Sequence, residues 1–239
     1  MVGSRVIPTA WVVEAQNRWT PNPPQGIPMC AIGVDTSGGG RDPMMIAARY
    51  DGWFSPLIEV PGSDLPPEKM GNTTASIVVA NRRDACPIVV DMGGGYGGPL
   101  YEHLTENDIE TIPYKGAEAS RARTADRQLG FYNKRSQAIW QFREALDPDQ
   151  DGGSPIALPL DPVLMADLTT PTFEVVPRGI KVEAKEDIVR RLGRSPDRGD
   201  AVVMSWYGGG VPQAYGRARS ARKPEVITKR KLRDRGRQR

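Results

Sequence analysis

The sequence predicts an α/β domain built on a mixed β-sheet, and three observations support this fold class. Two short apolar runs, residues 30–34 and 87–90, each lead into an aspartate that is followed by a glycine-rich turn. Apolar runs bounded by glycine are typical of buried strands. The dipeptide Asp51-Gly52 separates two further apolar segments, which is typical of a tight antiparallel turn. Apolar residues at helical spacing recur later in the chain, so helices are expected to cover the sheet.

Bulk composition limits the class of protein. The chain has 239 residues with 26 Gly and 22 Pro, enough for one sizeable domain with long loops or for two small ones. No apolar run reaches the roughly 18 residues of a membrane span, and the N-terminus lacks a signal-peptide pattern, so we expect a soluble intracellular protein. Cys30 and Cys86 are then expected as free thiols. His103 is the one histidine of the sequence and is expected on a helix surface. A zinc site of Cys/His type and a Ser-His-Asp triad are therefore not expected.

The first part of the chain predicts a lead-in followed by an antiparallel meander. Residues 7–16 predict a short helix capped at Thr9, and the proline-rich segment 21–26 excludes a helix or a central strand. Residues 1–28 are therefore expected to dock onto the domain or to join it to an upstream part. The meander strands are predicted at residues 30–34, 44–50 and 53–60.

The remaining chain predicts alternating helices and strands. Residues 156–168 have a mixed pattern, and no element is predicted there. Ser195 and Pro196 predict the start of a last helix, with Ser195 as N-cap. The other predicted elements are a helix at 66–83, a strand at 87–91, a helix at 98–107, a strand at 110–114, a helix within 124–147, a hairpin of strands 173–176 and 180–183, and a helix at 185–192.

Carboxylates occur where several of these elements begin or end. Asp35 follows the first buried strand, and Gly38–Gly40 would let the backbone lie close to whatever Asp35 binds. Asp91 ends a similar strand, while Asp197 and Asp200 lie three residues apart on one face of the last helix. Taken singly, such residues also cap turns or complement a helix dipole. Taken together, they suit a hard divalent cation and an incoming phosphate.

The order of elements resembles the ribonuclease H-like nuclease fold, a mixed sheet of an antiparallel meander plus parallel strands, flanked by helices. Several motifs resemble, more specifically, the C-terminal nuclease domain of tailed-phage terminase large subunits. The resemblance spans nearly the whole chain, and residues 195–200 are its most specific part. The motifs are Gly33-Val34-Asp35 with Gly38-Gly39-Gly40-Arg41-Asp42, Val90-Asp91-Met92-Gly93-Gly94, Lys181-Val182-Glu183-Ala184-Lys185 and the segment 193–201, and the lead-in 6–12 is similar to the family's connection from its ATPase.

The resemblance implies three regions. Residues 1–28 are expected as the lead-in from an upstream ATPase region, and residues 29–212 as the nuclease domain. Residues 213–239 are expected as a basic, disordered tail, since eleven of the last 23 residues are Lys or Arg. The chain has no phosphate-loop motif and no packaging ATPase, so it is expected to be an isolated domain.

The resemblance also implies an activity, a metal-dependent DNA endonuclease that cuts concatemeric DNA by two-metal-ion hydrolysis. Asp35 would bridge two Mg²⁺ or Mn²⁺ ions, and Asp91 and Asp197 would complete their ligand shells. Asp200 is either a fourth ligand or a group that supports the ligands. Lys185 either contacts the scissile phosphate or is an ordinary surface lysine. Asp42 either holds a metal-bound water or caps its turn.

The implied partners are double-stranded DNA and, in the full motor, the portal and the small terminase subunit. The isolated domain is expected to be a monomer without membrane contact, in the host cytoplasm and transiently at the procapsid portal. Two alternatives stay open, namely a module that docks DNA or the portal with weak or regulated nuclease activity, and a Holliday-junction-resolvase-like nuclease. A basic interval is expected to flank a DNA groove and comprises Arg121, Arg123, Arg127, Lys134 and Arg135.

Overall fold

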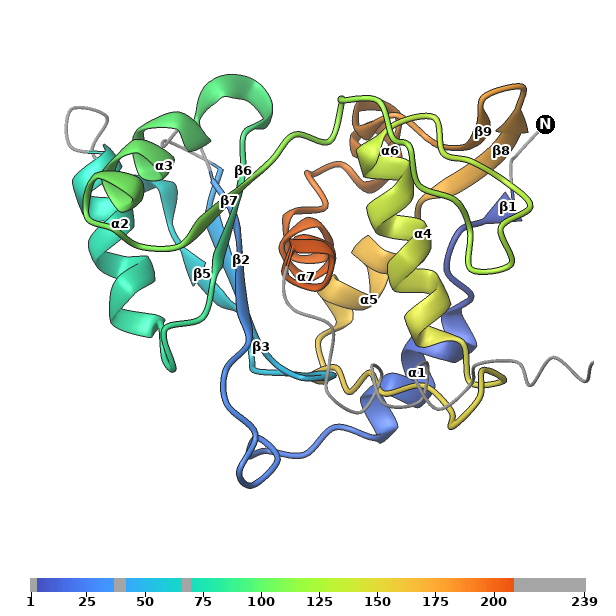
Figure 1. The fold of residues 1–239 in the computed structure, drawn as a ribbon, viewed down its shortest axis with the longest axis horizontal. Helices are drawn as coiled ribbons and strands as arrows, with labels where there is room; N and C mark the ends of the chain where they lie inside the picture. The colour runs from blue at the N-terminus through green and yellow to red at the C-terminus, as the bar shows by residue number, and fades with distance from the viewer. Residues whose placement is uncertain (1–3, 37–41, 66–69, 209–239) are drawn as a thin grey trace, which may run out of the picture.

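A mixed β-sheet forms the centre of the fold in the computed structural model, which describes residues 4–36, 42–65 and 70–208 (Figure 1). The turn at Gly38–Gly40 with Arg41 and the predicted tail 213–239 lie outside the described residues. The strand order is β4 (Trp53–Phe54), β3 (Met44–Tyr50), β2 (Ala31–Asp35), β6 (Ile88–Asp91) and β7 (Thr111–Tyr114), with β5 (Ile58–Val60) also paired to β3.

Strand directions in this sheet agree with the predicted fold class. β2 pairs antiparallel with β3 and parallel with β6, and β6 pairs parallel with β7. The segment 53–60 was predicted as one strand, but the structure divides it into β4 and β5, both antiparallel to β3. Pro56 lies in the break and has no N–H to give to a ladder. The prediction of a mixed sheet flanked by helices is confirmed.

Helices cover both faces of the sheet (Figure 1). One face packs on α2 (Met70–Asn81) and α3 (Gly97–Glu106) through a core that includes Ile32 and Val34. The other face packs on α7 (Asp197–Gly208), which is supported by α4 (Lys134–Leu146) and α5 (Pro162–Thr169). Because side chains alternate along a strand, Gly33 and Asp35 of β2 face α7. A Cβ placed on Gly33 would lie only 2.2 Å from the Ala201 carbonyl oxygen of α7.

The lead-in packs into the same core as α7. Helix α1 (Thr9–Asn17) contributes Val12 and Ala15, and Val6 and Ile7 before it are fully buried. Thr9 was predicted as the helix cap, but it is the first helical residue, and its hydroxyl accepts a hydrogen bond from Arg5 at 2.9 Å. Pro8 occupies the cap position without a side-chain hydrogen bond. The domain boundaries at residues 29 and 212 stay a prediction.

A second, three-stranded sheet lies near α4 and α6 (Figure 1). It contains β1 (Ser4–Arg5), β8 (Thr172–Val176) and β9 (Gly179–Val182), all paired antiparallel. Helix α6 (Lys185–Leu192) follows β9 after two residues, and short 3₁₀ turns lie at Gly62–Asp64 and Gly93–Gly95.

Helix α5 has no counterpart among the predicted elements. It begins at an N-cap, Asp161, whose carboxylate accepts hydrogen bonds from the backbone N–H groups of Val163 and Leu164.

Two further predictions concern the cysteines and the membrane. Both cysteines are free thiols. Among the helices in the described ranges, none is long and apolar enough to cross a membrane.

Candidate active site

Two aspartates end neighbouring parallel strands on the α7 side of the sheet. Val34 of β2 is paired in register with Val90 of β6, so the next residues, Asp35 and Asp91, lie side by side at the carboxyl ends of the strands. Both point to the face that α7 covers, because Gly33 and Val89 two residues earlier contact that helix. Asp35 is 5% exposed, so its carboxyl group lies almost entirely in the protein interior.

Glycines bring the chain close to the Asp91 end of β6. The Asp91 carboxylate accepts a hydrogen bond from the Gly93 N–H at 2.9 Å. A Cβ on Gly97, the first residue of α3, would lie 1.9 Å from the Asp91 carbonyl oxygen. Only glycine therefore allows α3 to begin where it does, directly against the end of β6.

The beginning of α7 supplies Asp197 and Asp200. The Asp200 N–H donates to the Pro196 carbonyl at 2.9 Å, so the helix starts close to the predicted position. Ser195 was predicted as the N-cap, and this is wrong, because its hydroxyl donates to the Asp197 carboxylate instead.

Asp167 of α5 provides the cap in place of Ser195. Its Oδ2 atom accepts backbone N–H groups of Arg198 and Gly199 at 3.1 and 3.2 Å. A cap from a residue some thirty positions away leaves no local pattern in the sequence around the helix start.

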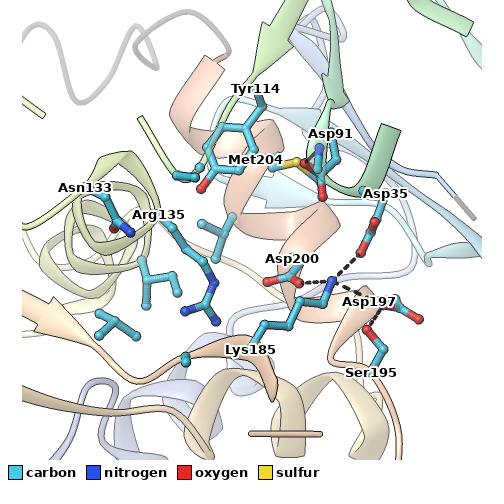
Figure 2. Close-up of a pocket in the computed structure, with 18 of the residues that line it drawn as sticks. Asp35, Asp91, Tyr114, Asn133, Arg135, Lys185, Ser195, Asp197, Asp200 and Met204 are labelled. Carbon is cyan, nitrogen blue, oxygen red and sulfur yellow. Dashed lines mark hydrogen bonds and ion pairs between the residues drawn. The ribbon is translucent and has the colours of Figure 1, made fainter. Parts of the chain in front are cut away.

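Lys185 lies between carboxylates that come from different elements (Figure 2). Its Nζ atom is 2.8 Å from Asp200 Oδ2, 3.6 Å from Asp35 Oδ2 and 3.7 Å from Asp197 Oδ1. Asp91 and Asp42 line the same cavity, which has a volume of about 580 Å³. The structure thus brings together Asp35, Asp91, Asp197, Asp200 and Lys185, as well as Asp42, whereas His103 on α3 does not line the cavity.

The cluster holds more negative than positive charge, and this changes the proton affinities of its members. Burial raises the pKa of Asp35 well above its usual range. Lys185 lowers this pKa, whereas repulsion from Asp200, Asp197 and Asp91 raises it further. Burial also raises the pKa of Asp91. Burial by itself would lower the pKa of Lys185, but the surrounding carboxylates outweigh it and raise that pKa above its ordinary value.

The donor set fits a hard divalent cation. It consists of carboxylate oxygens, which Mg²⁺ and Mn²⁺ prefer, and Asp35 Oδ2 is buried without a hydrogen-bond partner among the described residues. Across the described ranges, no group of three or more acidic, histidine or cysteine side chains is already arranged to hold an ion. The Lys185 ammonium takes the central place between the carboxylates instead.

The opposite wall of the cavity comes from α4, β9 and the segment before α4. Of the predicted basic interval, Arg135 lines the cavity, whereas Arg121, Arg123, Arg127 and Lys134 are not among its lining residues. The site prediction missed this wall. Sequence charge alone does not distinguish Arg135 from its neighbour Lys134, because the difference lies in which side of α4 meets the cavity. The wall residues are Tyr132, Asn133, Arg135 and Lys181, and Tyr114 of β7 lines the cavity beside Asp91.

This chain resembles known proteins in its three-dimensional structure. No protein-family model and no curated protein matches the sequence. The nuclease domain of the large terminase subunit gp2 of bacterial virus Sf6 matches with a TM-score of 0.63 and 20% identity, over 84% of this chain and 97% of that one.

Two metal-containing structures also match. A lysine-to-alanine variant of the Sf6 domain with manganese and β-thujaplicinol has a TM-score of 0.60 and 20% identity, over 84% of this chain and 97% of that one. The large terminase nuclease from thermophilic phage G20c with bound magnesium has a TM-score of 0.50 and 14% identity, over 78% and 84% of the two chains.

These matches define the class of fold. The chain has the ribonuclease H-like fold of phage large-terminase nuclease domains, with a mixed sheet flanked by helices. The resemblance predicted from the Asp35, Asp91 and 195–200 motifs is thereby confirmed at the level of the fold.

Proposed function

We propose that this chain is a metal-dependent DNA endonuclease of a viral genome-packaging motor, which cuts concatemeric DNA by two-metal-ion phosphodiester hydrolysis. One observation carries the proposal: Asp35, Asp197 and Asp200, from a strand end and a helix start, surround one ammonium group at a cavity that Asp91 also lines. The fold shared with terminase nuclease domains supports it.

Four carboxylates would hold the ions. Asp35 would bridge two Mg²⁺ or Mn²⁺ ions, because its carboxyl is the most buried of the four and its Oδ2 atom, which Lys185 approaches only at 3.6 Å, accepts no hydrogen bond in the described structure. Asp91, Asp197 and Asp200 would complete the set, in agreement with the manganese and magnesium named for the similar structures. Bound ions supply positive charge that stabilises an attacking water and a leaving oxygen.

Lys185 has two tasks in this proposal. It neutralises part of the surplus negative charge and so holds β2 and α7 together at the site. Its side chain also lines the cavity and keeps 34% of its surface exposed, so a phosphate in the cavity would meet it. We assign it the contact to the phosphate of the strand being cut. Asp42 at the rim is assigned to positioning water.

The substrate in this proposal is double-stranded DNA. Residues 29–212 form the nuclease domain, and the lead-in packs on it through Val6, Ile7 and Val12. The portal and the small terminase subunit are the proposed partners of the full motor.

Plasmid cleavage tests the proposal. Supercoiled DNA is incubated with the native chain in Mg²⁺, Mn²⁺ or EDTA, and compared with Asp91→Asn. The asparagine keeps an oxygen that accepts the Gly93 N–H, so the fold of the loop is preserved while the charge is lost. Asp187→Asn is the matched control, because Asp187 lies on α6 near Lys185 but is 46% exposed and paired with Arg190 outside the cavity.

The expected result is metal-dependent nicking and linearisation by the native chain and by Asp187→Asn, with at least a 100-fold loss in Asp91→Asn. Cleavage that survives Asp91→Asn would place the chemistry elsewhere. Salt-sensitive DNA binding without cleavage in any metal would favour a docking module instead of an enzyme.

A further inference from the structure

The cavity wall opposite the carboxylates carries an arginine without an acidic partner. Arg135 is the second residue of α4, and its Nη1 atom donates a hydrogen bond of 2.6 Å to the Glu183 carbonyl. Within the described parts of the chain, Arg135 has no carboxylate within ion-pair distance, and its Nε and Nη2 atoms make no hydrogen bond. The side-on edge of the guanidinium is therefore available to a ligand.

The other cations near this wall are already paired. Lys134, next to Arg135, contacts Glu118 at 2.5 Å and does not line the cavity. Lys181 lines the cavity but contacts Glu174 at 3.0 Å. Lys185 is surrounded by aspartates. Among the described cavity-lining residues, Arg135 is thus the cation that no carboxylate approaches within ion-pair distance, although its charge still acts on Asp91 through space.

The hydrogen bond to Glu183 also sets where Arg135 lies. Glu183 is between β9 and α6, two residues before Lys185, so the guanidinium is tied to the segment that carries the central lysine. Figure 2 shows Arg135 on one side of Lys185, with Asp35 and Asp197 on the other side. A group bound between these walls meets carboxylates on one side and a free arginine edge on the other.

A DNA backbone phosphate fits this place. The carboxylate side repels an anion, so a strand in the cavity needs a counter-charge that the aspartates do not already engage. A guanidinium with a free edge binds phosphate oxygens through two parallel N–H groups. Resting on the proposed function, we infer that Arg135 binds a backbone phosphate of the DNA strand being cut, at the scissile bond or next to it. It is a substrate-binding residue that sets the position of the strand over the aspartates.

DNA binding without cleavage tests this inference most directly. The Asp91→Asn chain serves as the uncut background, and its affinity for a duplex is measured between about 50 and 200 mM salt. Adding Arg135→Ala is expected to reduce the slope of log affinity against log salt by roughly 0.9, the value for one lost phosphate contact. Lys134→Ala is the matched control, since it removes the same charge one residue earlier, and it is expected to change the slope much less.

Arg135→Lys separates charge from geometry. Lysine keeps the charge but is a point donor without the fork, so the salt slope is expected to stay near that of the background. With Asp91 restored, Arg135→Lys is expected to cut at least tenfold more slowly than the native chain, because the phosphate is held less accurately. Circular dichroism of each variant checks that the bond to Glu183 is not needed for folding.

Each outcome decides one or both of the two proposals. If the native chain cuts DNA but Arg135→Ala and Lys134→Ala give equal slopes and rates, the phosphate contact is wrong and the nuclease stands. If the native chain does not cut but Arg135→Ala alone lowers the slope, the contact stands and the nuclease is wrong. If the chain binds no DNA at any salt, both are wrong.

Discussion

The Lys185 ammonium lies 2.8 Å from the Asp200 carboxylate, and Asp35 and Asp197 approach it from two other directions. A single cation thus joins the end of β2 to the first turn of α7. The same arrangement explains why the carboxylates remain close together in spite of their mutual repulsion.

Lys185→Ala should weaken the metal-free protein and increase its response to metal. Loss of the ammonium leaves the carboxylates facing one another, and we expect the free energy of unfolding in EDTA to fall by about 2 kcal/mol. Mn²⁺ should then raise the melting temperature more in the variant than in the native chain, because the ion no longer competes with a lysine. Thermal unfolding with and without Mn²⁺ measures this. An equal Mn²⁺ response in both proteins would show that the ion and the lysine do not share the carboxylates.

Gly97→Ala should strongly slow cleavage, whereas Gly98→Ala should not. A Cβ on Gly97 would lie 1.9 Å from the Asp91 carbonyl, while one on Gly98 has no heavy atom within 4 Å. We expect Gly97→Ala to displace Asp91, destabilise the fold by roughly 1–3 kcal/mol and reduce the cleavage rate by about 100-fold. Gly98→Ala should stabilise α3 by about 0.5–1 kcal/mol. Denaturant unfolding and plasmid cleavage are the measurements, and similar behaviour of the two variants would contradict the close approach at Gly97.

Asp167→Asn should change how stability depends on pH. Burial raises the pKa of Asp167 from 3.8 to about 6, although Arg194 and the Gly199 N–H favour the charged form. Between about pH 4 and pH 6 the native state therefore binds more protons than the unfolded state, so the free energy of unfolding falls as pH rises through this window. The difference amounts to roughly 3 kcal/mol for this group.

In Asp167→Asn this pH-dependent part should be missing, while the amide oxygen still accepts the N–H groups at the start of α7. Urea unfolding of both metal-free proteins from about pH 4 to pH 7 tests it. Parallel stability curves for the two proteins would exclude a raised pKa at Asp167.

Arg49→Ala should destabilise the protein far more than removal of an exposed arginine. Arg49 is fully buried, donates to the carbonyls of Ser205 and Asp51, and lies 4.9 Å from the centre of the Trp206 ring. Its loss removes the donor from the carbonyls of the buried Ser205 and the partly buried Asp51, and we expect a decrease of roughly 3 kcal/mol in the free energy of unfolding.

Arg190→Ala is the control, because that side chain is 77% exposed and its pair with Asp187 is expected to contribute less than about 1 kcal/mol. Denaturant unfolding compares the two variants. Equal losses would show that the buried guanidinium does not hold the C-terminal end of α7.

Much of the fold follows from local patterns in the sequence. Apolar runs that end in aspartate predicted β2 and β6, and the turn at Asp51-Gly52 predicted the antiparallel pairing of β3 with β4. Residues 53–60 were an exception, since Pro56 divides the expected strand. Helix α5 was missed although Asp161 as N-cap and Pro162 at the first helical position are local signals of a helix start, because its short, largely apolar sequence has no clear polar face.

For the site, the sequence alone determined which carboxylates were candidates, because Asp35, Asp91 and Asp197 stand at the ends of elements that local patterns predict. Only the tertiary structure decided that Lys185 lies between them, that Asp167 caps α7 and that Arg135 faces the cavity. The physical reason is that element type depends on spacing within about ten residues, which the sequence displays directly. Contacts between residues far apart in the chain depend on how whole elements pack, and no local spacing encodes that.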